Sequence, residues 1–349
     1  MKIGIIGASL AGLVAGDKLA KAGHDVTVIE KERKPGGRLA THYMDDNNFF
    51  DYGIPFLKAD GDTFKEVVND LGEKKMVHQW MDELPIHDGS HLHKMNRNKH
   101  EVEYYAADSG FNSIADHLKR WVDIKSQEQA GGLTYIGMDR GKKRTWMVNL
   151  TDISVFECDA VILAAPAPQA YGVLQTAQDE TAALRIIREI DGLHYKPRYV
   201  LMASYNREIP SWKGIKCIKS NLSWISNESS KSTKQEKTNI VIHSSPNFVK
   251  KHFGKDPEEI ESILLKQAGR VVGESWLERP DYTNQHFWRY YQAEDIINED
   301  FMELEKDDAP LALIGDYFKG KSPEAAYLSA ISLADYWIEK YSETVSVNI

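Results

Sequence analysis

The first thirty residues carry the pattern that most constrains the fold. Residues 2–7 (KIGIIG) form a short apolar run, residues 10–22 have the apolar spacing of a helix, and residues 25–30 (DVTVIE) form a β-branched run that ends in an acid. The right-handed crossover of such a unit places both strand ends and the helix N-terminus at one edge of a parallel sheet. The sequence therefore predicts an α/β fold that begins with a nucleotide-binding βαβ unit.

The loop GASLAG, residues 7–12, departs from the usual G-x-G-x-x-G pattern at one position. Gly7 is predicted to make the tight turn and Gly12 to allow close contact between helix and strand, whereas Ser9 stands where the backbone approaches a pyrophosphate. Serine is small, and its hydroxyl could donate to a phosphate oxygen. Glu30 follows 23 residues after Gly7, where a carboxylate can accept hydrogen bonds from ribose hydroxyls. A purely structural glycine turn is the alternative.

Two further stretches point to a long ligand. Gly36 and Gly37 permit a second close backbone approach, and Arg38 offers a fork of donors to a pyrophosphate, with a surface salt bridge as the alternative. Gly315-Asp316 lies in a predicted buried strand (311–318), before a helix that starts at Ser322-Pro323. Enzymes that bind only a nicotinamide cofactor need the first loop alone, so the three stretches together favour FAD. Neither cysteine lies near the C-terminal loop, so the FAD is expected to be non-covalent.

Composition excludes several classes of protein. The 349 residues suffice for two domains, and 43 basic against 52 acidic side chains give a net charge of −9, which disfavours nucleic acid. No apolar run is long enough to span a membrane, and the two cysteines form no C-x-x-C pair. We therefore expect a soluble cytoplasmic protein without a nucleic-acid or membrane partner. The histidines, including those of HDGSHLH (87–93), lack metal-ligand spacing, so no metal is expected.

The middle of the chain mixes helices and strands. Residues 111–122 and 257–273 have helical periodicity, and TWMVNL (145–150) and DAVILAAP (159–166) are typical of strands. Residues 226–239 (SNESSKSTKQEKTN) contain no hydrophobic side chain. This composition predicts a solvated hairpin loop.

The chain as a whole resembles the glutathione-reductase-type flavoproteins of the amine oxidase superfamily, and within them most closely the renalase family. The resemblance covers nearly the whole length. Besides the glycine loop, Gly36-Gly37-Arg38 and Gly315-Asp316, the matching stretches are FFDYGIPFL (49–57), SGFNSIADHL (109–118), VILAAPAPQA (161–170), LSWISNESSK (222–231), VIHSSP (241–246) and FWRYYQAE (287–294).

The resemblance implies two lobes and a set of cofactor contacts. A Rossmann-like FAD domain with a parallel sheet would comprise residues 1–56, 106–168 and 303–349, and a substrate domain with a mainly antiparallel sheet, residues 57–105 and 169–302, would roof the flavin. Leu133 is matched by position only. The predicted cofactor contacts are Gly7, Ala8, Ser9, Leu10, Ala11, Gly12, Glu30, Lys31, Gly37, Arg38, Gly53, Ile54, Leu133, Gly315 and Asp316.

The resemblance also implies an activity. The renalase family is associated with the oxidation of dihydronicotinamide isomers, and dioxygen is returned as hydrogen peroxide. The expected partners are thus a small-molecule donor, with NAD(P)H or an isomer as candidate, and O2 as acceptor. Flavin amine oxidation and a non-catalytic FAD-binding role are the alternatives. Ser9, Ala325 and Ala330 replace glycines of the relatives, and residues 78–103 lack a clear counterpart, which leaves the substrate open.

Four residues are predicted to act on the substrate. Trp288 and Tyr290 would stack on a flat heterocycle, and Arg289 would pair with a carboxylate or phosphate. His243 is the fourth candidate. Core aromatics, a structural ion pair and a satisfied core histidine are the respective alternatives.

Overall fold

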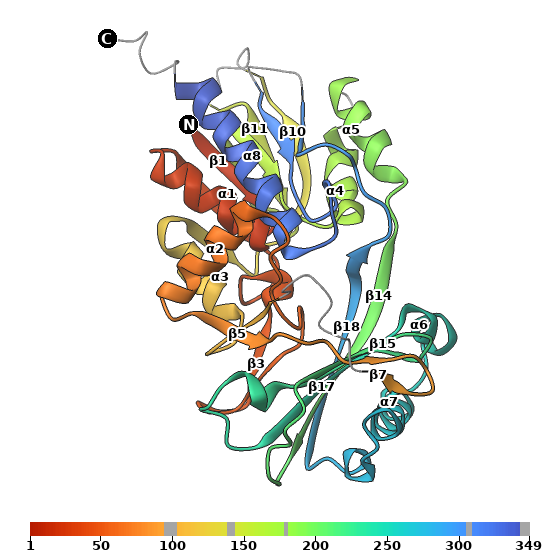
Figure 1. The fold of residues 1–349 in the computed structure, drawn as a ribbon. Coiled ribbons are helices and arrows are strands. Elements are labelled where there is room, and N and C mark those ends of the chain that lie inside the picture. Colours follow the sequence, from red (N-terminus) through yellow and green to blue (C-terminus); the bar gives the residue numbers. More distant parts are fainter. Residues whose placement is uncertain (94–102, 138–143, 178–180, 305–308, 343–349) are drawn as a thin grey trace. The chain divides into compact units, whose positions relative to one another are not determined.

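The computed structural model describes residues 1–93, 103–137, 144–177, 181–304 and 309–342. The chain divides into two compact units (Figure 1). The first unit comprises Met1–Gly37, Ile114–His194 and Ala293–Ile349. The second unit comprises Arg38–Ser113 and Tyr195–Gln292. Each unit is therefore assembled from segments that are distant in the sequence.

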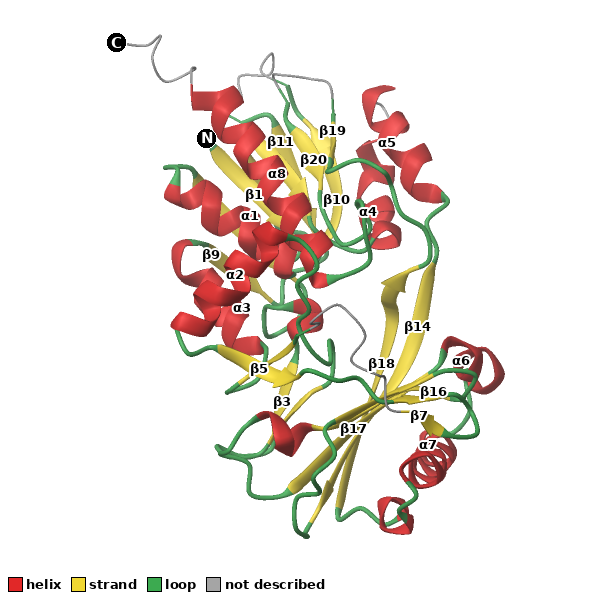
Figure 2. Cartoon of the chain, in the orientation of Figure 1, coloured by secondary structure: helices red, strands yellow, loops and turns green. Residues whose placement is uncertain are grey.

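The first unit contains a six-stranded sheet in the order β19-β20-β13-β1-β2-β9. Its strands are parallel except β19, which runs antiparallel to β20. Helices α1 and α8 lie side by side along this sheet (Figures 1 and 2). The bounds are β1 (Lys2–Ile6), β2 (Asp25–Glu30), β9 (Asp123–Ser126), β13 (Ala160–Leu163), β19 (Met302–Glu303), β20 (Leu311–Leu313), α1 (Leu10–Lys21) and α8 (Pro323–Ser342).

Smaller elements complete the first unit. A three-stranded antiparallel sheet has the order β10-β11-β12, and its strand β10 lies beside helix α4. The bounds are β10 (Ala130–Tyr135), β11 (Trp146–Leu150), β12 (Val155–Cys158), α4 (Ala167–Leu174) and α5 (Thr181–Asp191), and helix α3 (Asn112–Leu118) crosses the boundary between the units.

The register of the parallel strands brings their carboxyl ends to one edge. Ile6 pairs with Leu163 on one side and with Ile29 on the other, and Leu163 in turn pairs with Leu313. Strands covered on both faces are almost continuously apolar, and the central strands β1 and β13 follow this rule. The loops after β1, β2, β13 and β20 consequently leave the sheet at the same edge, where α/β proteins bind ligands.

The second unit is built on a seven-stranded sheet in the order β18-β14-β17-β16-β15-β6-β7. Strand β14 pairs with β17, β17 with β16 and β16 with β15, all antiparallel. Strands β6 and β7 are also antiparallel, whereas β15 and β6 are parallel. The bounds are β6 (Ile86–His87), β7 (Leu92–His93), β14 (Tyr195–Tyr205), β15 (Gly214–Cys217), β16 (Leu222–Asn227), β17 (Thr238–Ser244) and β18 (Tyr282–Ala293).

Helices and two small sheets accompany this sheet. Leu264 and Ala268 of α7 pack against Leu201 and Ile242 of the sheet in one apolar core. The two-stranded sheets pair β3 with β4 and β5 with β8. The bounds are β3 (Thr41–Tyr43), β4 (Phe49–Asp51), β5 (Val77–Met81), β8 (Tyr104–Ala107), α2 (Asp62–Glu73), α6 (Pro246–His252) and α7 (Pro257–Val272).

The predicted fold class is confirmed: a Rossmann-like parallel sheet is accompanied by a mainly antiparallel sheet in the other unit. The end of one helix and the end of one strand differ from the prediction. The helix predicted for 111–122 ends at Leu118, and a 3-10 turn with a 64% exposed Trp121 follows. Strand β20 ends at Leu313 instead of continuing to residue 318, because Gly315 and the residues after it turn toward α8.

The prediction for residues 226–239 was right about a hairpin, because the stretch joins the antiparallel strands β16 and β17, and wrong about a solvated loop. This stretch is no solvated loop, because Ser226, Asn227, Glu228 and Lys231 are fully buried, as are Thr238 and Asn239. It contains the end of β16, a 3-10 turn over Glu228–Lys231 and the start of β17. Polar side chains are buried here because they bond to one another, a pairing that composition does not reveal.

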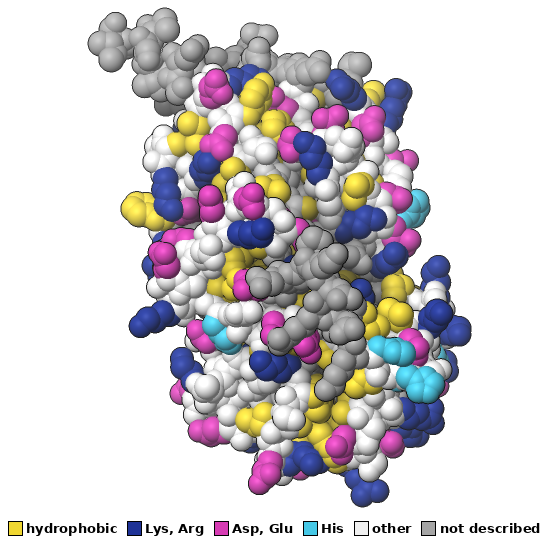
Figure 3. Space-filling view, in the orientation of Figure 1, with side chains coloured by type: hydrophobic (Ala, Val, Ile, Leu, Met, Phe, Trp, Pro, Cys, Tyr) yellow, Lys and Arg dark blue, Asp and Glu magenta, His cyan; other side chains and the backbone are white. Residues whose placement is uncertain are grey.

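The surface and the helices give two further observations. On the face drawn in Figure 3, basic and acidic side chains are interspersed. Within the described ranges, none of the helices is both long enough and apolar enough to cross a membrane.

Candidate functional site

The glycine loop follows β1 and has no room for side chains at its ends. Gly7 has a φ of +104°, and a Cβ there would lie 2.8 Å from the Ala164 carbonyl oxygen. A Cβ at Gly12 would clash with the Gly7 carbonyl oxygen. Both positions therefore need glycine, the first for its backbone conformation and the second for the approach of α1 to the loop.

Ser9 has a structural role in this loop. It is the N-cap of α1: its Oγ accepts a hydrogen bond from the Gly12 amide at 3.4 Å and donates to the Ala164 carbonyl at 2.8 Å. The hydroxyl hydrogen, expected to face a phosphate, is thus used within the protein. Beyond the cap, the amides of Leu10 and Ala11 belong to the first turn of α1, where backbone N–H groups lack intrahelical partners.

The second predicted stretch lies against the first. The Gly36 amide donates to the Ala8 carbonyl at 2.7 Å, and Gly36 and Ser9 form a parallel bridge. Gly37 has a φ of +54°, and a Cβ there would lie 3.5 Å from the Ser9 Cα atom. The loops after β1 and β2 consequently form one backbone surface within the first unit.

Glu30 closes this surface at the end of β2. Its side chain is buried, its Oε2 accepts from the Ala8 amide at 2.8 Å, and its Oε1 accepts from the Glu32 amide at 2.9 Å. Burial raises the pKa of this carboxyl, and the two backbone hydrogen bonds act in the opposite direction. Each oxygen has a further lone pair, so the carboxylate can accept from a ribose hydroxyl. The neighbouring Lys31 is exposed.

The C-terminal stretch reaches the same edge of the sheet. The Gly315 amide donates to Ser329 Oγ of α8 at 3.2 Å, and Asp316 is buried. Strand β20 is separated from β1 by β13 alone, so the loops after β20 and β1 are about 10 Å apart across the strands. Tyr317 spans part of this distance, because its hydroxyl donates to the Ala165 carbonyl at 3.4 Å. The structure thus brings Gly315-Asp316 to the edge that carries the glycine loop.

Leu133 occupies a different place in the first unit. It lies on β10 in the three-stranded sheet, its side chain is fully buried, and its amide donates to Thr176 Oγ1 at 2.7 Å. Its amide is therefore already engaged by the protein.

The remaining predicted cofactor contacts meet in the second unit. The Ile54 amide donates to the Arg38 carbonyl at 2.9 Å, and a Cβ at Gly53 would clash with that carbonyl. The Arg38 Nη1 donates to the Tyr291 carbonyl at 2.7 Å, while the Tyr291 hydroxyl donates to the Gly53 carbonyl at 3.1 Å. Tyr291, which the sequence reasoning did not single out, links Arg38 to the Gly53–Ile54 turn.

The three neighbouring candidates on β18 have different surroundings. Trp288 stacks on Tyr52 with ring centroids 5.7 Å apart and donates from Nε1 to the Tyr52 carbonyl. Tyr290 meets Tyr195 edge to face at 5.6 Å. Arg289 is exposed, and no described residue forms an ion pair with it. The structure therefore does not bring these three side chains together as one wall.

His243 is buried but not satisfied. Its side chain is fully buried on β17, and neither ring nitrogen has a hydrogen-bond partner among the described residues. The ring meets Tyr291 edge to face at 5.7 Å. Burial, followed by the charges of Arg198 and Lys231, lowers the pKa of His243 well below its usual value. The imidazole is neutral near pH 7, and the alternative of a satisfied core histidine does not hold.

This environment predicts a pH dependence of stability. Because the folded protein keeps His243 neutral, the unfolded chain binds one more proton below about pH 6.5. The free energy of unfolding therefore falls by up to about 1.4 kcal/mol for each pH unit by which the pH is lowered below that value. Urea unfolding of the wild type and of His243→Asn from pH 8 to 5.5 measures this slope. In His243→Asn we expect the slope of the free energy of unfolding against pH to decrease by the contribution of one proton. His91→Asn, at an exposed histidine, should keep the slope of the wild type. Equal slopes in wild type and His243→Asn would refute the assignment.

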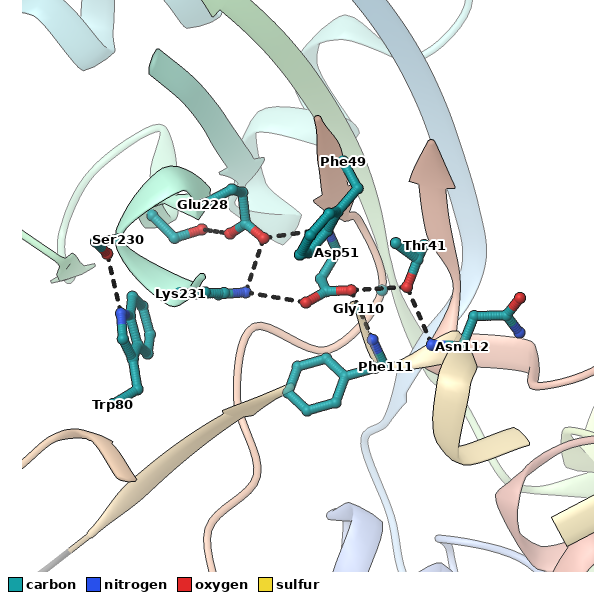
Figure 4. Close-up of polar contacts among 12 residues, drawn as sticks. Thr41, Phe49, Asp51, Trp80, Gly110, Phe111, Asn112, Glu228, Ser230 and Lys231 are labelled. Carbon is teal, nitrogen blue, oxygen red and sulfur yellow. Dashed lines mark hydrogen bonds and ion pairs between the residues drawn. The ribbon is translucent and has the colours of Figure 1, made fainter. Parts of the chain in front are cut away.

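A buried charge network in the second unit was missed altogether (Figure 4). Lys231 Nζ lies 2.8 Å from Glu228 Oε2 and 3.5 Å from Asp51 Oδ2, and all three side chains are fully buried. The Asp51 amide donates to Glu228 Oε2 at 3.0 Å. Trp80 and Phe111 place their rings 5.2 and 5.6 Å from Lys231 Nζ. We call Asp51, Glu228 and Lys231 the buried triad.

Neutral groups complete the triad's hydrogen bonds. Asp51 Oδ1 accepts from Thr41 Oγ1 at 2.7 Å and from the Phe111 amide at 2.9 Å, and Ser226 Oγ donates to Glu228 Oε1 at 2.5 Å. Burial raises the pKa of Glu228, the Lys231 charge lowers it, and the Asp51 charge raises it again. The triad anchors Asp51, two residues before the predicted cofactor contact Gly53.

The sequence held one signal for the triad. Glu228 and Lys231 are three residues apart, a spacing that puts an acid and a base together on a helical turn. Their joint occurrence with Asp51, 177 positions before Glu228, is not visible from spacing.

The thiols and histidines of the described residues offer no metal site. No group of three or more histidine, cysteine, aspartate or glutamate side chains within the described ranges could hold an ion. Cys158 and Cys217 are buried, and burial raises the pKa of each thiol to about 12.

Comparison with protein-family models gives two matches. Residues 5–71 match an NAD(P)-binding Rossmann-like domain, and residues 84–336, well over half of the chain, match the flavin containing amine oxidoreductases. The first matched range contains the glycine loop, Glu30 and Arg38. The second contains His243, the residues of β18 and Asp316.

Curated relatives match only locally. A 4,4'-diapophytoene desaturase (4,4'-diaponeurosporene-forming) of Staphylococcus haemolyticus is 35% identical over 86 residues, which are 25% of this chain and 16% of that protein. The same enzyme of Staphylococcus aureus (strain Newman) is 38% identical over 73 residues, 21% of this chain and 14% of the relative. The alignment thus covers less than a fifth of either relative.

Three solved structures each match 96–97% of the chain at low identity. An Exiguobacterium protein has a TM-score of 0.72 at 10% identity, covering 97% of this chain and 99% of the other. Putrescine oxidase bound to putrescine has a TM-score of 0.68 at 12% identity with the same coverage, and an oxidoreductase from Methanosarcina mazei has 0.64 at 14%, covering 96% and 100%. At these identities the likeness establishes the fold alone.

Proposed function

This chain belongs to the family of flavin-containing amine oxidoreductases, and from that membership we propose that it binds FAD non-covalently and oxidises a small planar donor. The donor is a dihydronicotinamide isomer or a related dihydropyridine. Dioxygen accepts the electrons and leaves as hydrogen peroxide. The observation that carries the proposal is the convergence of Gly7–Gly12, Glu30, Gly37 and Gly315-Asp316 at one sheet edge of the first unit.

The residues at this edge fit a dinucleotide. A Cβ at Gly7 or at Gly12 would clash with neighbouring backbone, so the Gly7 turn and the first turn of α1 pack together with no side chain between them. That N-terminus attracts a pyrophosphate, and Glu30 accepts from the adenosine ribose while repelling a 2′-phosphate. Asp316 is placed to accept from a hydroxyl further along the same ligand. The loop after β20 also precedes α8, whose N-terminus carries positive dipole charge.

The protein's own part in the chemistry is binding and orientation. Bound flavin supplies a two-electron acceptor. Loss of hydride from a dihydropyridine needs no protein base, which agrees with the weak basicity of His243, whose pKa is lowered by burial. Trp288, held by its stack on Tyr52, offers a flat surface on which a planar donor can lie.

One experiment tests the proposal. The purified protein is examined by anaerobic absorption spectroscopy, challenged separately with dihydronicotinamide isomers and with primary amines, and then exposed to oxygen while peroxide is measured. We expect a flavin spectrum that bleaches with the dihydronicotinamide isomers and returns with formation of peroxide. A colourless protein that releases no flavin on denaturation would refute FAD binding. Bound FAD that no donor bleaches would instead indicate a non-catalytic flavoprotein.

Amine oxidation is the second candidate. The second unit holds three mutually contacting aromatic rings, with His286 centred 5.1 Å from Tyr52 and 4.4 Å from Trp288. Aromatic faces attract cations, and the family's description names amines. Bleaching by amines alone in the same experiment would favour this function.

The two predicted arginines should respond differently to truncation. Arg38→Ala removes a charged donor and the bond to the Tyr291 carbonyl, so we expect FAD to bind about 10- to 100-fold more weakly. Arg289→Ala is expected to spare FAD binding and to slow reduction by the donor. Fluorescence titration of the apoprotein with FAD measures the first effect, and anaerobic stopped-flow absorbance measures the second. The reverse pattern would overturn the division of roles.

A further inference from the structure

Arg198 on β14 is a partly buried arginine that forms no ion pair with a described carboxylate. Its guanidinium lies 3.8 Å from the centre of the Tyr291 ring, and its Nε atom is buried and has no hydrogen-bond partner. No described carboxylate forms an ion pair with it. Burial lowers the pKa of Arg198, yet a guanidinium stays protonated at neutral pH. A guanidinium largely removed from water that has no carboxylate partner among the described residues is costly, and such charges are normally paired or bound to a ligand.

The neighbouring side chain is unsatisfied as well. His243 contacts the same Tyr291 ring and has two buried ring nitrogens without partners. The charges that act on His243 are those of Arg198 and Lys231, and both are positive. Lys231 forms ion pairs with Glu228 and Asp51, whereas no described carboxylate pairs with Arg198. One arginine and one histidine thus present three unsatisfied nitrogen atoms around one tyrosine.

This pair adjoins the predicted cofactor contacts of the second unit. The Tyr291 hydroxyl donates to the Gly53 carbonyl, and the Tyr291 carbonyl accepts from Arg38. Arg198 itself retains partial solvent exposure. A ligand group that reached Arg198 would therefore lie beside residues already proposed to contact FAD.

We propose that Arg198, with His243 beside it, binds the anionic group of the donor, a carboxylate or a phosphate. A guanidinium forms two parallel hydrogen bonds with either group, and the approach of an anion would supply the counter-charge that the described carboxylates do not. A protonated amine would be repelled by the same charge. This inference rests on the proposed function in one respect, namely that the anion belongs to the donor. The binding of an anion at Arg198 can be measured independently of any reaction.

Calorimetric titration of the purified holoprotein tests the proposal with probes of one shape and different charge. The probes are benzoate, phenylphosphonate, benzamide and benzylamine. We expect benzoate or phenylphosphonate to bind at least about 10-fold more tightly than neutral benzamide, and benzylamine to bind most weakly. The stronger of the two anions identifies the group as carboxylate or phosphate.

Two substitutions assign the preference to Arg198. Arg198→Met should abolish the preference for the anion over benzamide, whereas Arg198→Lys, which keeps the charge without the planar fork, should reduce it and keep its sign. Arg207→Met is the matched control, because Arg207 also stacks on an aromatic ring, 3.9 Å from Trp276, but is exposed. This control should leave the preference unchanged. Circular dichroism verifies that each variant is folded, and Arg198→Lys decides the question if Arg198→Met is not.

Several outcomes would overturn the proposal. These are equal binding of benzoate, phenylphosphonate and benzamide to the wild type, a preference that Arg198→Lys leaves unaltered, and tightest binding of benzylamine. Failure of the proposed function gives a different pattern: the protein would lack flavin or would not be reduced, while the anion preference and its dependence on Arg198 persisted.

Discussion

Lys231→Met is expected to lower the free energy of unfolding by about 3–5 kcal/mol, because it leaves two carboxylates buried without their counter-ion. Methionine has a similar length, so lost packing contributes little. The Glu228 and Asp51 side chains, seen around Lys231 in Figure 4, would then repel each other in a region from which water is excluded. Urea unfolding followed by circular dichroism at pH 7 measures the loss.

Two further variants separate the charge effect from general damage. Glu228→Gln combined with Lys231→Met removes one acid together with the base, so the double variant should be more stable than Lys231→Met alone. Lys65→Met removes an exposed lysine on α2 that lies 3.3 Å from Asp62, and it should change stability by less than about 0.5 kcal/mol. A loss in Lys231→Met no larger than that of Lys65→Met would show that the triad does not depend on its cation.

Gly12→Ala is expected to weaken FAD binding by at least about 100-fold, equivalent to about 2.7 kcal/mol. The added Cβ would clash with the Gly7 carbonyl oxygen and approach the Ala164 Cβ to 3.0 Å, so α1 must move away from the loop that it caps. The N-terminal amides of α1 and the Gly7 turn would then no longer be positioned to bind the same pyrophosphate. Flavin absorbance per protein after gel filtration, followed by titration of the apoprotein with FAD, measures the effect.

Gly172→Ala provides the matched control. Gly172 lies in α4 of the same unit, and a Cβ there meets no atom within 4 Å. Alanine favours helix by about 1 kcal/mol over glycine, so this variant should bind FAD normally and be as stable as the wild type or more so. If both alanine variants retained flavin equally, the glycine loop would not be the cofactor site.

The first unit could be predicted in detail because its signals are local. The apolar run of β1, the spacing of α1 and the β-branched β2 lie within 30 residues, and the crossover of a βαβ unit has a fixed hand. The sequence therefore indicated that Gly7, Glu30 and Gly315 leave one sheet edge before any contact was known. It could not indicate that the Ser9 hydroxyl bonds to Ala164, because that residue, directly after β13, is 155 positions away in the sequence.

The second unit was less predictable, because its polar side chains are placed by tertiary pairing. A polar composition is typical of exposed loops, and residues 226–239 depart from that rule through partners such as Asp51 and Asn48. The sequence did not single out Arg198, because an arginine within a strand pattern is ordinary until the described residues show no carboxylate paired with it. Arg289 was singled out from its aromatic neighbours, and its role toward the donor stays a prediction.

The interlocked polar stretch after β16 has a consequence for protein engineering. Asn239 donates to Gln235, Gln235 donates to the Phe49 carbonyl, and Trp80 donates to Ser230, so each exchange disturbs a partner elsewhere in the chain. Transplanting this stretch alone into a homologous protein would bury its polar groups without their hydrogen-bond partners. A workable chimera would have to carry the strand-β4 and strand-β5 partners along with it, as one inherited block.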